Sequence, residues 1–521
     1  MNRRKLYALS IYVLFTVLMI LTLANKENLY IDEVCSYGLA NHSGDPYMSI
    51  EDGQTYYPAG TPWVEYMSVS PDHRFDYANV WSNQAQDVHP PLYYVLLHTI
   101  CSFMPGIFTI WFAGLINIIF ALGTLYFVRK LIWLWLEDEL LQSVISLGFV
   151  CSAGILSAVS FLRMYMMAMF WVTALTYLIL CRMEKQHTVR FYLLLLLCTV
   201  GGAMTHYYCI VYTIFISIVY GCCLLYQKRW KETGFFCLTQ GIAGLLSIAV
   251  FPAMIRHVFS SSRGEESADN LIGTSMMTVL TRVRRFFSIL DGQLFGNLFI
   301  YVFFAALIIL FVWGLRRIAS VSESGKKIVI MRYLCGTVPI ILYFILISII
   351  AVYLADRYMY PIYAVLFVTV TCGIAKWIKS MTGSRYVYVC VTALIAAVMI
   401  VNSWKNINWG YLYQSSRTLL ETASAYADVD CVFVYNKIYE PNSAYFEASN
   451  YNSVTFFRED DLEMLGSLDL SSRYTMILMT TENDEEILEE VLALCPDLGV
   501  YEYLGEYAYT HTYYLHPAEN N

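Results

Sequence analysis

Apolar segments of about 20 residues recur along the first 403 residues, and charged side chains are rare within them. A helix of that length crosses the hydrocarbon core of a bilayer, which is about 30 Å thick. Only 14% of the residues are charged, against about 25% in an average soluble domain, and 58% are hydrophobic. The sequence therefore predicts an α-helical polytopic membrane protein and excludes a single soluble globular domain.

About 11 spans are predicted, counting an uncleaved first helix over Leu6–Ala24. A cleaved signal peptide is the alternative for this segment, because three basic residues precede it and small residues end it. Several of the other spans are short, which implies tilted helices or a locally thinned bilayer. They are 107–127, 140–160, 165–181, 191–205, 208–226, 235–254, 297–315, 333–352, 360–375 and 386–403.

The distribution of charge supports this topology. With a cytoplasmic N-terminus, 19 of the 33 Lys and Arg lie on the inner side and every inner loop is basic. An odd number of spans then places the C-terminal region outside. Residues 421–521 hold 20 Asp and Glu but three Lys and Arg, a net −17, so the preceding residues carry +9 within the total of −8. This change of sign predicts a domain boundary near residues 404–421.

The predicted domains are a transmembrane domain, residues 1–404, and an acidic, extracytoplasmic α/β domain, residues 405–521. Residues 25–106 are expected to form a first outer loop with juxtamembrane helices, and residues 255–296 a second large outer loop. In the acidic domain, "CVFVY" and "YTMILMTT" are typical of strands. "NDEEILEEVLAL" is typical of a helix with an acidic first turn, and "GVYEYLGEYAYTHTYYL" of a hairpin. No glycine-rich phosphate loop occurs, so ATP-driven chemistry has no support.

Five polar motifs stand out, because the predicted topology places all of them on the outer face. The first outer loop begins with "IDE" and ends with "DVHPP", and the other three motifs join pairs of spans. The residues concerned are Asp32 and Glu33 in "IDE", Asp87 and His89 in "DVHPP", Arg163 and Tyr165 in "FLRMYMM", His206 and Tyr207 in "THYY", and Arg357 and Tyr358 in "ADRYMYP".

Each motif also has a purely structural explanation. Asp32 could cap a helix, His206 could be a packed interfacial histidine, and the two arginines could extend to lipid headgroups. Ionisable groups near membrane depth are nevertheless functional candidates. Carboxylates act as general bases or hold metals, arginines bind phosphate in a bidentate manner, and His and Tyr hydrogen-bond phosphate or sugar. Such a set suits a phosphate-linked substrate at the outer leaflet. A transporter or flippase of a lipid-linked or phosphorylated substrate is the alternative, although its polar groups would gather near the midplane.

Two further segments are predicted to lie at the interface. Pro91 and Pro105 enclose Leu92–Met104, which as a helix is about 20 Å long and too short to span. We expect a juxtamembrane helix there, with the turn at Pro90 and Pro91 holding His89 and Asp87 near the space that Asp32 faces.

In the second outer loop, "TVLTRVRRFFSIL" has apolar residues at helical spacing, which predicts an amphipathic helix on the membrane. Its arginines are candidates for lipid-phosphate contacts. The apolar positions are Leu280, Val283, Phe287 and Leu290, and the basic ones are Arg282, Arg284 and Arg285.

In their order and spacing, the five motifs resemble those of GT-C class membrane glycosyltransferases, in particular the protein O-mannosyltransferase and aminoarabinose transferase group. The resemblance covers about residues 1–405. It implies inverting transfer of a hexose or pentose from a polyprenyl-phosphate carrier to a glycan, lipid or protein acceptor, at the outer face of the cytoplasmic membrane. No nucleic acid partner is expected. A polymerase or ligase of surface polysaccharide is a further alternative, but the first-loop motif favours a monosaccharide transferase.

The same resemblance implies roles for the motif residues. Asp32 is expected to be the general base that activates the acceptor hydroxyl, with Glu33 supporting it. Arg163, Arg357 and His206 are expected to hold the departing carrier phosphate. Many aminoarabinose-transferase-like members carry Lys at the position of His89, and a His form occurs in the mannosyltransferase branch. Some relatives use a divalent metal ion and others do not, so a metal cofactor stays open. The expected substrate-binding set is Asp87, His89, Arg163, Tyr165, His206, Tyr207, Arg357 and Tyr358.

Overall fold

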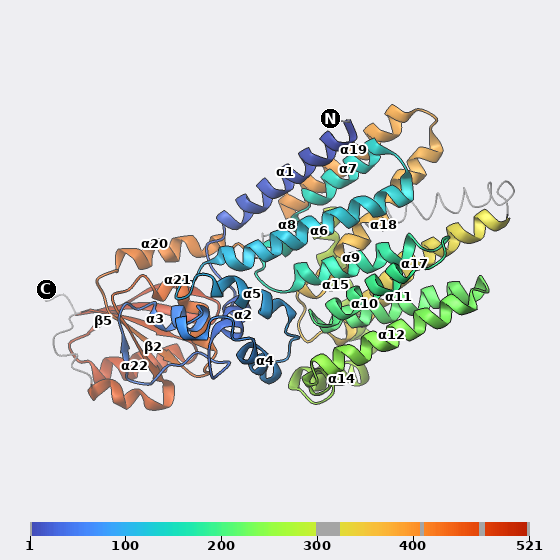
Figure 1. The fold of residues 1–521 in the computed structure, drawn as a ribbon. Helices are drawn as coiled ribbons and strands as arrows, with labels where there is room; N and C mark the ends of the chain where they lie inside the picture. The colour runs from blue at the N-terminus through green and yellow to red at the C-terminus, as the bar shows by residue number, and fades with distance from the viewer. Residues whose placement is uncertain (1–2, 299–322, 407–410, 468–474, 518–521) are drawn as a thin grey trace. The chain divides into compact units, whose positions relative to one another are not determined.

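The computed structural model describes residues 3–298, 323–406, 411–467 and 475–517 (Figure 1). The chain forms two compact units, each built from separate stretches of sequence. The helical unit comprises Met1–Leu23, Val88–Tyr93 and Gly114–Gly410, and the sheet unit comprises Ala24–Asp87, Tyr94–Ala113 and Tyr411–Asn521. The sheet unit thus contains most of the predicted first outer loop together with the C-terminal region. The functional division at residues 404 and 405 stays a prediction.

The helical unit is a bundle in which neighbouring pairs include α9 with α18, α10 with α12, and α11 with α17 (Figure 1). The first few residues of α6 belong to the sheet unit. Its elements are α1 (Arg3–Ala24), α6 (Ile110–Leu136), α7 (Glu139–Val150), α8 (Ala153–Ser160), α9 (Tyr165–Leu180), α10 (Val189–Ala203), α11 (Tyr207–Tyr226), α12 (Trp230–Val250), α13 (Ala253–Phe259), α14 (Ser262–Gly273), α15 (Met276–Phe295), α17 (Glu323–Ile350), η2 (Asp356–Tyr358), α18 (Tyr360–Met381) and α19 (Arg385–Asn406).

Within the described residues, seven helices are long and apolar enough to cross a membrane, namely α1, α6, α11, α12, α17, α18 and α19. The predicted span 140–160 is bent by 51° between α7 and α8, and counts as an eighth if the pair is one span. The predicted spans 165–181 and 191–205 correspond to the shorter apolar helices α9 and α10. The predicted span 297–315 lies almost entirely outside the described residues. The protein is therefore a mostly helical chain with several helices able to span a membrane.

The sheet unit contains a six-stranded mixed sheet in the order β1-β3-β2-β4-β6-β5. Strands β3, β2 and β4 are parallel, and β5 and β6 form an antiparallel hairpin. The elements are α2 (Ile31–Asn41), β1 (Thr55–Tyr56), α3 (Thr61–Met67), η1 (Pro71–His73), α4 (Tyr77–Gln86), α5 (Leu92–Ser102, divided between the units after Tyr93), η3 (Gln414–Ser416), α20 (Arg417–Ala425), β2 (Cys431–Tyr435), η4 (Glu440–Ala444), α21 (Tyr445–Ala448), β3 (Val454–Arg458), η5 (Glu459–Ser467), β4 (Met476–Thr480), α22 (Asp484–Leu494), β5 (Val500–Tyr507) and β6 (Thr510–His516).

The strands and the helix predicted in the acidic region are confirmed as β2, β4, α22 and the β5–β6 hairpin. All five residues of β2 and of β4 are buried, as expected of central strands covered on both faces. A strand from the first loop completes the sheet, because β1 pairs antiparallel with β3 through Thr55 and Thr455. The helix predicted after Pro91 is confirmed as α5, an apolar helix of 11 residues that is too short to span, and its position beside the membrane stays a prediction.

One acid is buried within the sheet unit. Glu447 on α21 is 2% exposed, and its Oε1 accepts hydrogen bonds from Thr512 (2.6 Å) and Tyr451 (3.1 Å). Its Oε2 has no hydrogen-bond partner among the described residues. Burial raises the pKa of Glu447 from 4.5 to about 7, and the two hydroxyl groups only partly oppose this. The folded state therefore prefers the protonated acid.

Glu447→Gln is expected to change how stability depends on pH. The folded protein binds a proton that the unfolded chain loses above pH 4.5, so wild-type stability falls as pH rises from about 4.5 to 7. A pKa difference of that size corresponds to about 3 kcal/mol. Relative to wild type, the Gln variant should gain about that much stability between pH 4.5 and pH 8, in thermal or urea unfolding of the full chain. An equal difference between the two proteins at both pH values would contradict the assignment.

Candidate functional site

The two first-loop carboxylates lie on α2 but in different surroundings. Glu33 is fully buried, and its Oε2 accepts from the backbone N of Tyr30 (2.7 Å), which caps the helix, and from Lys26 Nζ (3.0 Å). Lys26 is also buried and donates to the carbonyl oxygen of Tyr411. Burial lowers the pKa of Lys26, and the Glu33 carboxylate opposes this shift. Glu33 therefore stabilises the start of α2 through an internal ion pair.

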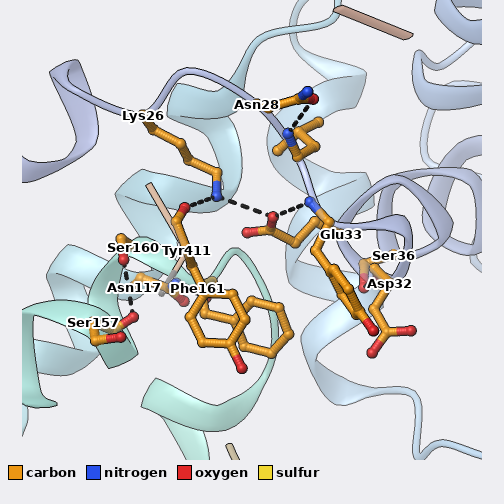
Figure 2. Close-up of polar contacts among 12 residues, drawn as sticks. Lys26, Asn28, Asp32, Glu33, Ser36, Asn117, Ser157, Ser160, Phe161 and Tyr411 are labelled. Atoms are coloured by element: carbon orange, nitrogen blue, oxygen red, sulfur yellow. Dashed lines mark hydrogen bonds and ion pairs between the residues drawn. The ribbon is translucent and has the colours of Figure 1, made fainter. Parts of the chain in front are cut away.

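Asp32 is half-buried, and in Figure 2 it points away from the Lys26–Glu33 pair. Adjacent helix positions are about 100° apart, so neighbouring acids face different sides of α2. The expected support of Asp32 by Glu33 stays a prediction. The role of Asp32 as the general base likewise stays a prediction.

Asp87 is brought close to the same helix. It is half-buried at the C-terminal end of α4, which packs against α2. Burial holds the pKa of Tyr66 well above its ordinary value, and the charges of Cys35 and then Asp87 add to the shift. Cys35 follows Asp32 by three residues, on the neighbouring turn of α2. The sheet unit thus carries Asp32 on α2 and Asp87 at the end of a helix that packs on α2, and their shared place in one site stays a prediction.

In the helical unit, three candidate residues lie at helix N-termini. Arg163 precedes α9, His206 is the N-cap of α11, and Arg357 lies in η2 just before α18. They are 4%, 7% and 8% exposed. The three helix starts are adjacent, because the ring of Tyr165 lies 5.1 Å from that of His206 and 6.3 Å from that of Tyr360. The positive ends of three helix dipoles and two guanidinium groups therefore gather in one largely buried region, which we call the cationic cluster.

The turn that carries Arg163 is held by hydrogen bonds from a neighbouring helix, α6. It joins α8 to α9, and the buried amide of Asn117 on α6 donates to the carbonyl oxygens of Val159 (2.9 Å) and Phe161 (2.8 Å; Figure 2). Within the turn, the backbone N of Arg163 donates to the carbonyl oxygen of Phe161 (2.7 Å). The guanidinium group is thus attached to a fixed backbone, which is what a site of defined geometry requires.

His89 belongs to this cluster. Arg163 Nη2 lies 3.3 Å from His89 Nε2, and because a guanidinium group only donates, that nitrogen must accept. The ring of His89 lies 6.3 Å from that of His206. The segment is anchored to the α10–α11 turn, since the backbone N of Leu92 donates to Met204 O (2.9 Å). The cluster thus brings together His89, Arg163 and His206, which are far apart in the sequence.

His206 combines a structural and a chemical role. Its Nδ1 accepts from the backbone N of Tyr208 (3.0 Å) and so caps α11. Burial holds the pKa of His206 well below its ordinary value, and the charges of His89 and Arg163 lower it further. The ring is therefore neutral near pH 7, and with Nδ1 accepting, the proton resides on Nε2. This nitrogen is therefore a neutral hydrogen-bond donor.

His206→Asn is expected to separate these roles. Asn keeps the N-cap acceptor, so the thermal midpoint should stay near that of wild type. If Nε2 binds an oxygen of a charged substrate, its loss should weaken binding of that substrate about 10- to 100-fold, the effect of one hydrogen bond to a charged group. His206→Ala, which loses both groups, should be less stable as well as less active. Full activity of the Asn variant would remove Nε2 from the site.

Aromatic rings complete the cluster. The Arg357 guanidinium lies over the rings of Phe161 (5.9 Å) and Tyr358 (5.4 Å). Of the two tyrosines in "THYY", Tyr208 packs against His206 (4.8 Å between ring centroids). Tyr207 instead hydrogen-bonds His257 on α13 through its hydroxyl (2.7 Å). The role of Tyr207 in substrate binding stays a prediction, and Tyr208, which was not predicted, contacts His206 as well.

The amphipathic segment is confirmed as helical within α15, and its position on a membrane stays a prediction. Phe286 and Leu290 are buried, whereas Leu280 is exposed. Arg282 donates to the carbonyl oxygen of Ser348 (2.8 Å) and to that of Ala351. Its guanidinium is thus engaged by the end of α17, and Arg284 and Arg285 are the exposed arginines.

Other residues of the region were not predicted. Asp356 lies directly before Arg357, and Gln293 and Tyr360 bind its carboxylate. In the sequence, the position of Asp356 directly before Arg357 was the only indication of its role. For Lys26, the only indication was its spacing of seven residues from Glu33. No group of three His, Cys, Asp or Glu side chains that could hold a metal ion occurs in the described part of the chain.

Neither a family profile nor a curated protein sequence matches this chain. Among solved structures, it is similar to the archaeal oligosaccharyltransferase AglB from Archaeoglobus fulgidus, determined in complex with an inhibitory peptide and a dolichol-phosphate. The TM-score is 0.44 at 10% sequence identity, and the match covers 100% of this chain and 75% of that one.

Proposed function

We propose that this protein transfers a sugar from a polyprenyl-phosphate carrier to an acceptor at the outer face of the cytoplasmic membrane, with inversion at the anomeric carbon. The cationic cluster carries the proposal. Two buried guanidinium groups, a neutral histidine donor and three helix N-termini match the dianionic oxygens of a phosphate better than any neutral ligand. The motif resemblance supports the same class of donor. The motif resemblance assigns the general base to Asp32 of the sheet unit and the phosphate-binding groups to the cluster of the helical unit.

The reaction balances without a covalent enzyme intermediate. Asp32 takes the proton of the acceptor hydroxyl as its oxygen attacks the anomeric carbon. The bond from that carbon to the phosphate oxygen breaks, and the polyprenyl phosphate leaves with the electron pair. Arg163, Arg357 and the Nε2 proton of His206 neutralise the charge that develops on the phosphate. Asp87 is assigned to the acceptor or the sugar, because it lies beside α2 with Asp32.

A comparison of a deletion strain with its parent tests this function. The deletion strain should accumulate one polyprenyl-phosphate sugar and lose one sugar from a surface glycan, lipid or protein. The purified protein should then release polyprenyl phosphate from that donor only when the acceptor is present. Movement of the donor across vesicles without bond cleavage would instead identify a flippase. An unchanged set of glycans and lipid-linked sugars would contradict the proposal.

A further inference from the structure

A buried polar network lies directly behind Arg357 within the helical unit. The carboxylate Oδ2 of Asp356 accepts from the hydroxyl of Tyr360 (2.7 Å) and from Nε2 of Gln293 (2.7 Å). The hydroxyl of Tyr360 also lies 3.1 Å from that of Ser157 on α8. The hydroxyl of Tyr363 donates to Oε1 of Gln293 (2.6 Å). Three segments, α8, α15 and α18, thus converge on one acid.

The side-chain amide of Gln293 has one defined orientation in this network. Because the carboxylate of Asp356 only accepts, the amide of Gln293 must present Nε2 to it, which leaves Oε1 to accept from the hydroxyl of Tyr363. Gln293 is held in turn at its backbone, where its carbonyl oxygen accepts from Ser152 (3.1 Å). Gly154 makes room for it, since a Cβ there would lie 2.9 Å from that of Gln293. The amide is therefore built into place.

The network ends at the backbone of Arg357. The other carboxylate oxygen of Asp356, Oδ1, accepts from the backbone N of Arg357 (2.7 Å). A carboxylate fixed by two donors on one oxygen therefore holds the backbone of the neighbouring arginine with the other oxygen. The guanidinium then lies over Phe161 and Tyr358. The ring of Tyr360 also contacts the ring of Tyr165, which in turn packs on His206.

We propose that Asp356, Gln293 and Tyr360 are positioning residues that hold Arg357 in the orientation in which it binds the phosphate of the lipid donor. This inference rests on the proposed function and deepens it. Preorganised cations stabilise a leaving phosphate because they need no rearrangement as the charge develops. None of the three positioning residues is required to touch the substrate. They act through the backbone of Arg357 and through the ring of Tyr360.

Tyr360→Phe tests the proposal with little change of volume. It removes one of two donors to Asp356 and should weaken binding of polyprenyl phosphate by the full-length protein about tenfold. Gln293→Leu should act in the same direction. Tyr220→Phe is the matched control: Tyr220 is equally buried in the helical unit, and its hydroxyl lies 2.6 Å from Nε2 of His187, away from this network. The control variant should bind polyprenyl phosphate as wild type does.

A double-mutant cycle with Arg357→Ala separates positioning from general destabilisation. In that background Tyr360→Phe should change binding less than twofold, because the group that it positions is absent. A tenfold loss in both backgrounds, or no loss in either, would overturn the positioning role. Wild-type protein that binds no polyprenyl phosphate would overturn the proposed function, and this inference with it. Hydrogen exchange of residues 355–359 distinguishes a failure of the proposed function alone. Faster exchange there in Tyr360→Phe would show that the network still holds the backbone around Arg357.

Discussion

Asp32→Asn is expected to abolish sugar transfer while the protein still inserts and folds. The amide cannot accept the acceptor proton, and a positioned general base contributes about 10²- to 10⁴-fold to the rate. Asp32 is half-buried on α2 and lies apart from the Lys26–Glu33 ion pair, so its replacement leaves the internal packing of the sheet unit intact. The measurement is kcat for transfer from a defined lipid-linked sugar, together with binding of that sugar donor. Donor binding should stay within a few-fold of wild type, since the cationic cluster is untouched.

Asp72→Asn provides the control for this prediction. Asp72 is an exposed acid of the same unit, in η1, and the substitution makes the same chemical change on the surface. It should leave kcat unchanged. Near-normal transfer by Asp32→Asn would remove Asp32 from the role of base and direct attention to Asp87, the other carboxylate beside α2. A parallel fall of kcat in both variants would point to a general effect of charge.

The helical body could be predicted from the sequence because a span is a local pattern of contiguous apolar residues. The strands β2 and β4 could be predicted for the same reason, as short apolar runs. Which segments of the chain make up the sheet unit could not be predicted. Strand β1 is two residues long and has no periodicity, and it pairs with a strand 400 residues later, where the hydroxyl groups of Thr55 and Thr455 lie 2.8 Å apart. A pairing of that separation depends on the path of the whole chain.

The candidate site shows the same division. The types of residue that bind a phosphate, and their places at the ends of apolar helices, were visible in the motifs. Which of two adjacent residues faces the site was not, because neighbours on a helix differ by about 100°. For this reason Tyr208 rather than Tyr207 packs on His206, and Glu33 is internal where Asp32 is not. The Gln293–Asp356 hydrogen bond joins α15 to η2. It could not be predicted, because neither segment has a local sequence pattern that indicates the other.

The ion pair of Lys26 and Glu33 is expected to dominate the stability of the first loop. Lys26→Met would leave the Glu33 carboxylate buried without its cation, and removing one partner of a buried pair costs about 3–5 kcal/mol. The lysine also donates to Tyr411 O, so its loss unties α2 from the C-terminal segment of the same unit. Thermal unfolding of the full chain should show a clearly lower midpoint. The double variant Lys26→Met/Glu33→Gln should recover much of the loss, because no charge remains buried.

Activity measurements on the same variants separate structure from catalysis. If Glu33 acts only through the fold, the double variant should transfer sugar at a rate close to wild type per folded molecule. Retention of the fold with loss of transfer would instead return Glu33 to the reaction, as the adjacent acids of the first-loop motif had suggested. The hydrogen bond from the backbone N of Tyr30 survives in Glu33→Gln, since an amide oxygen accepts it as well. The comparison therefore changes the charge of the side chain while keeping the cap of α2.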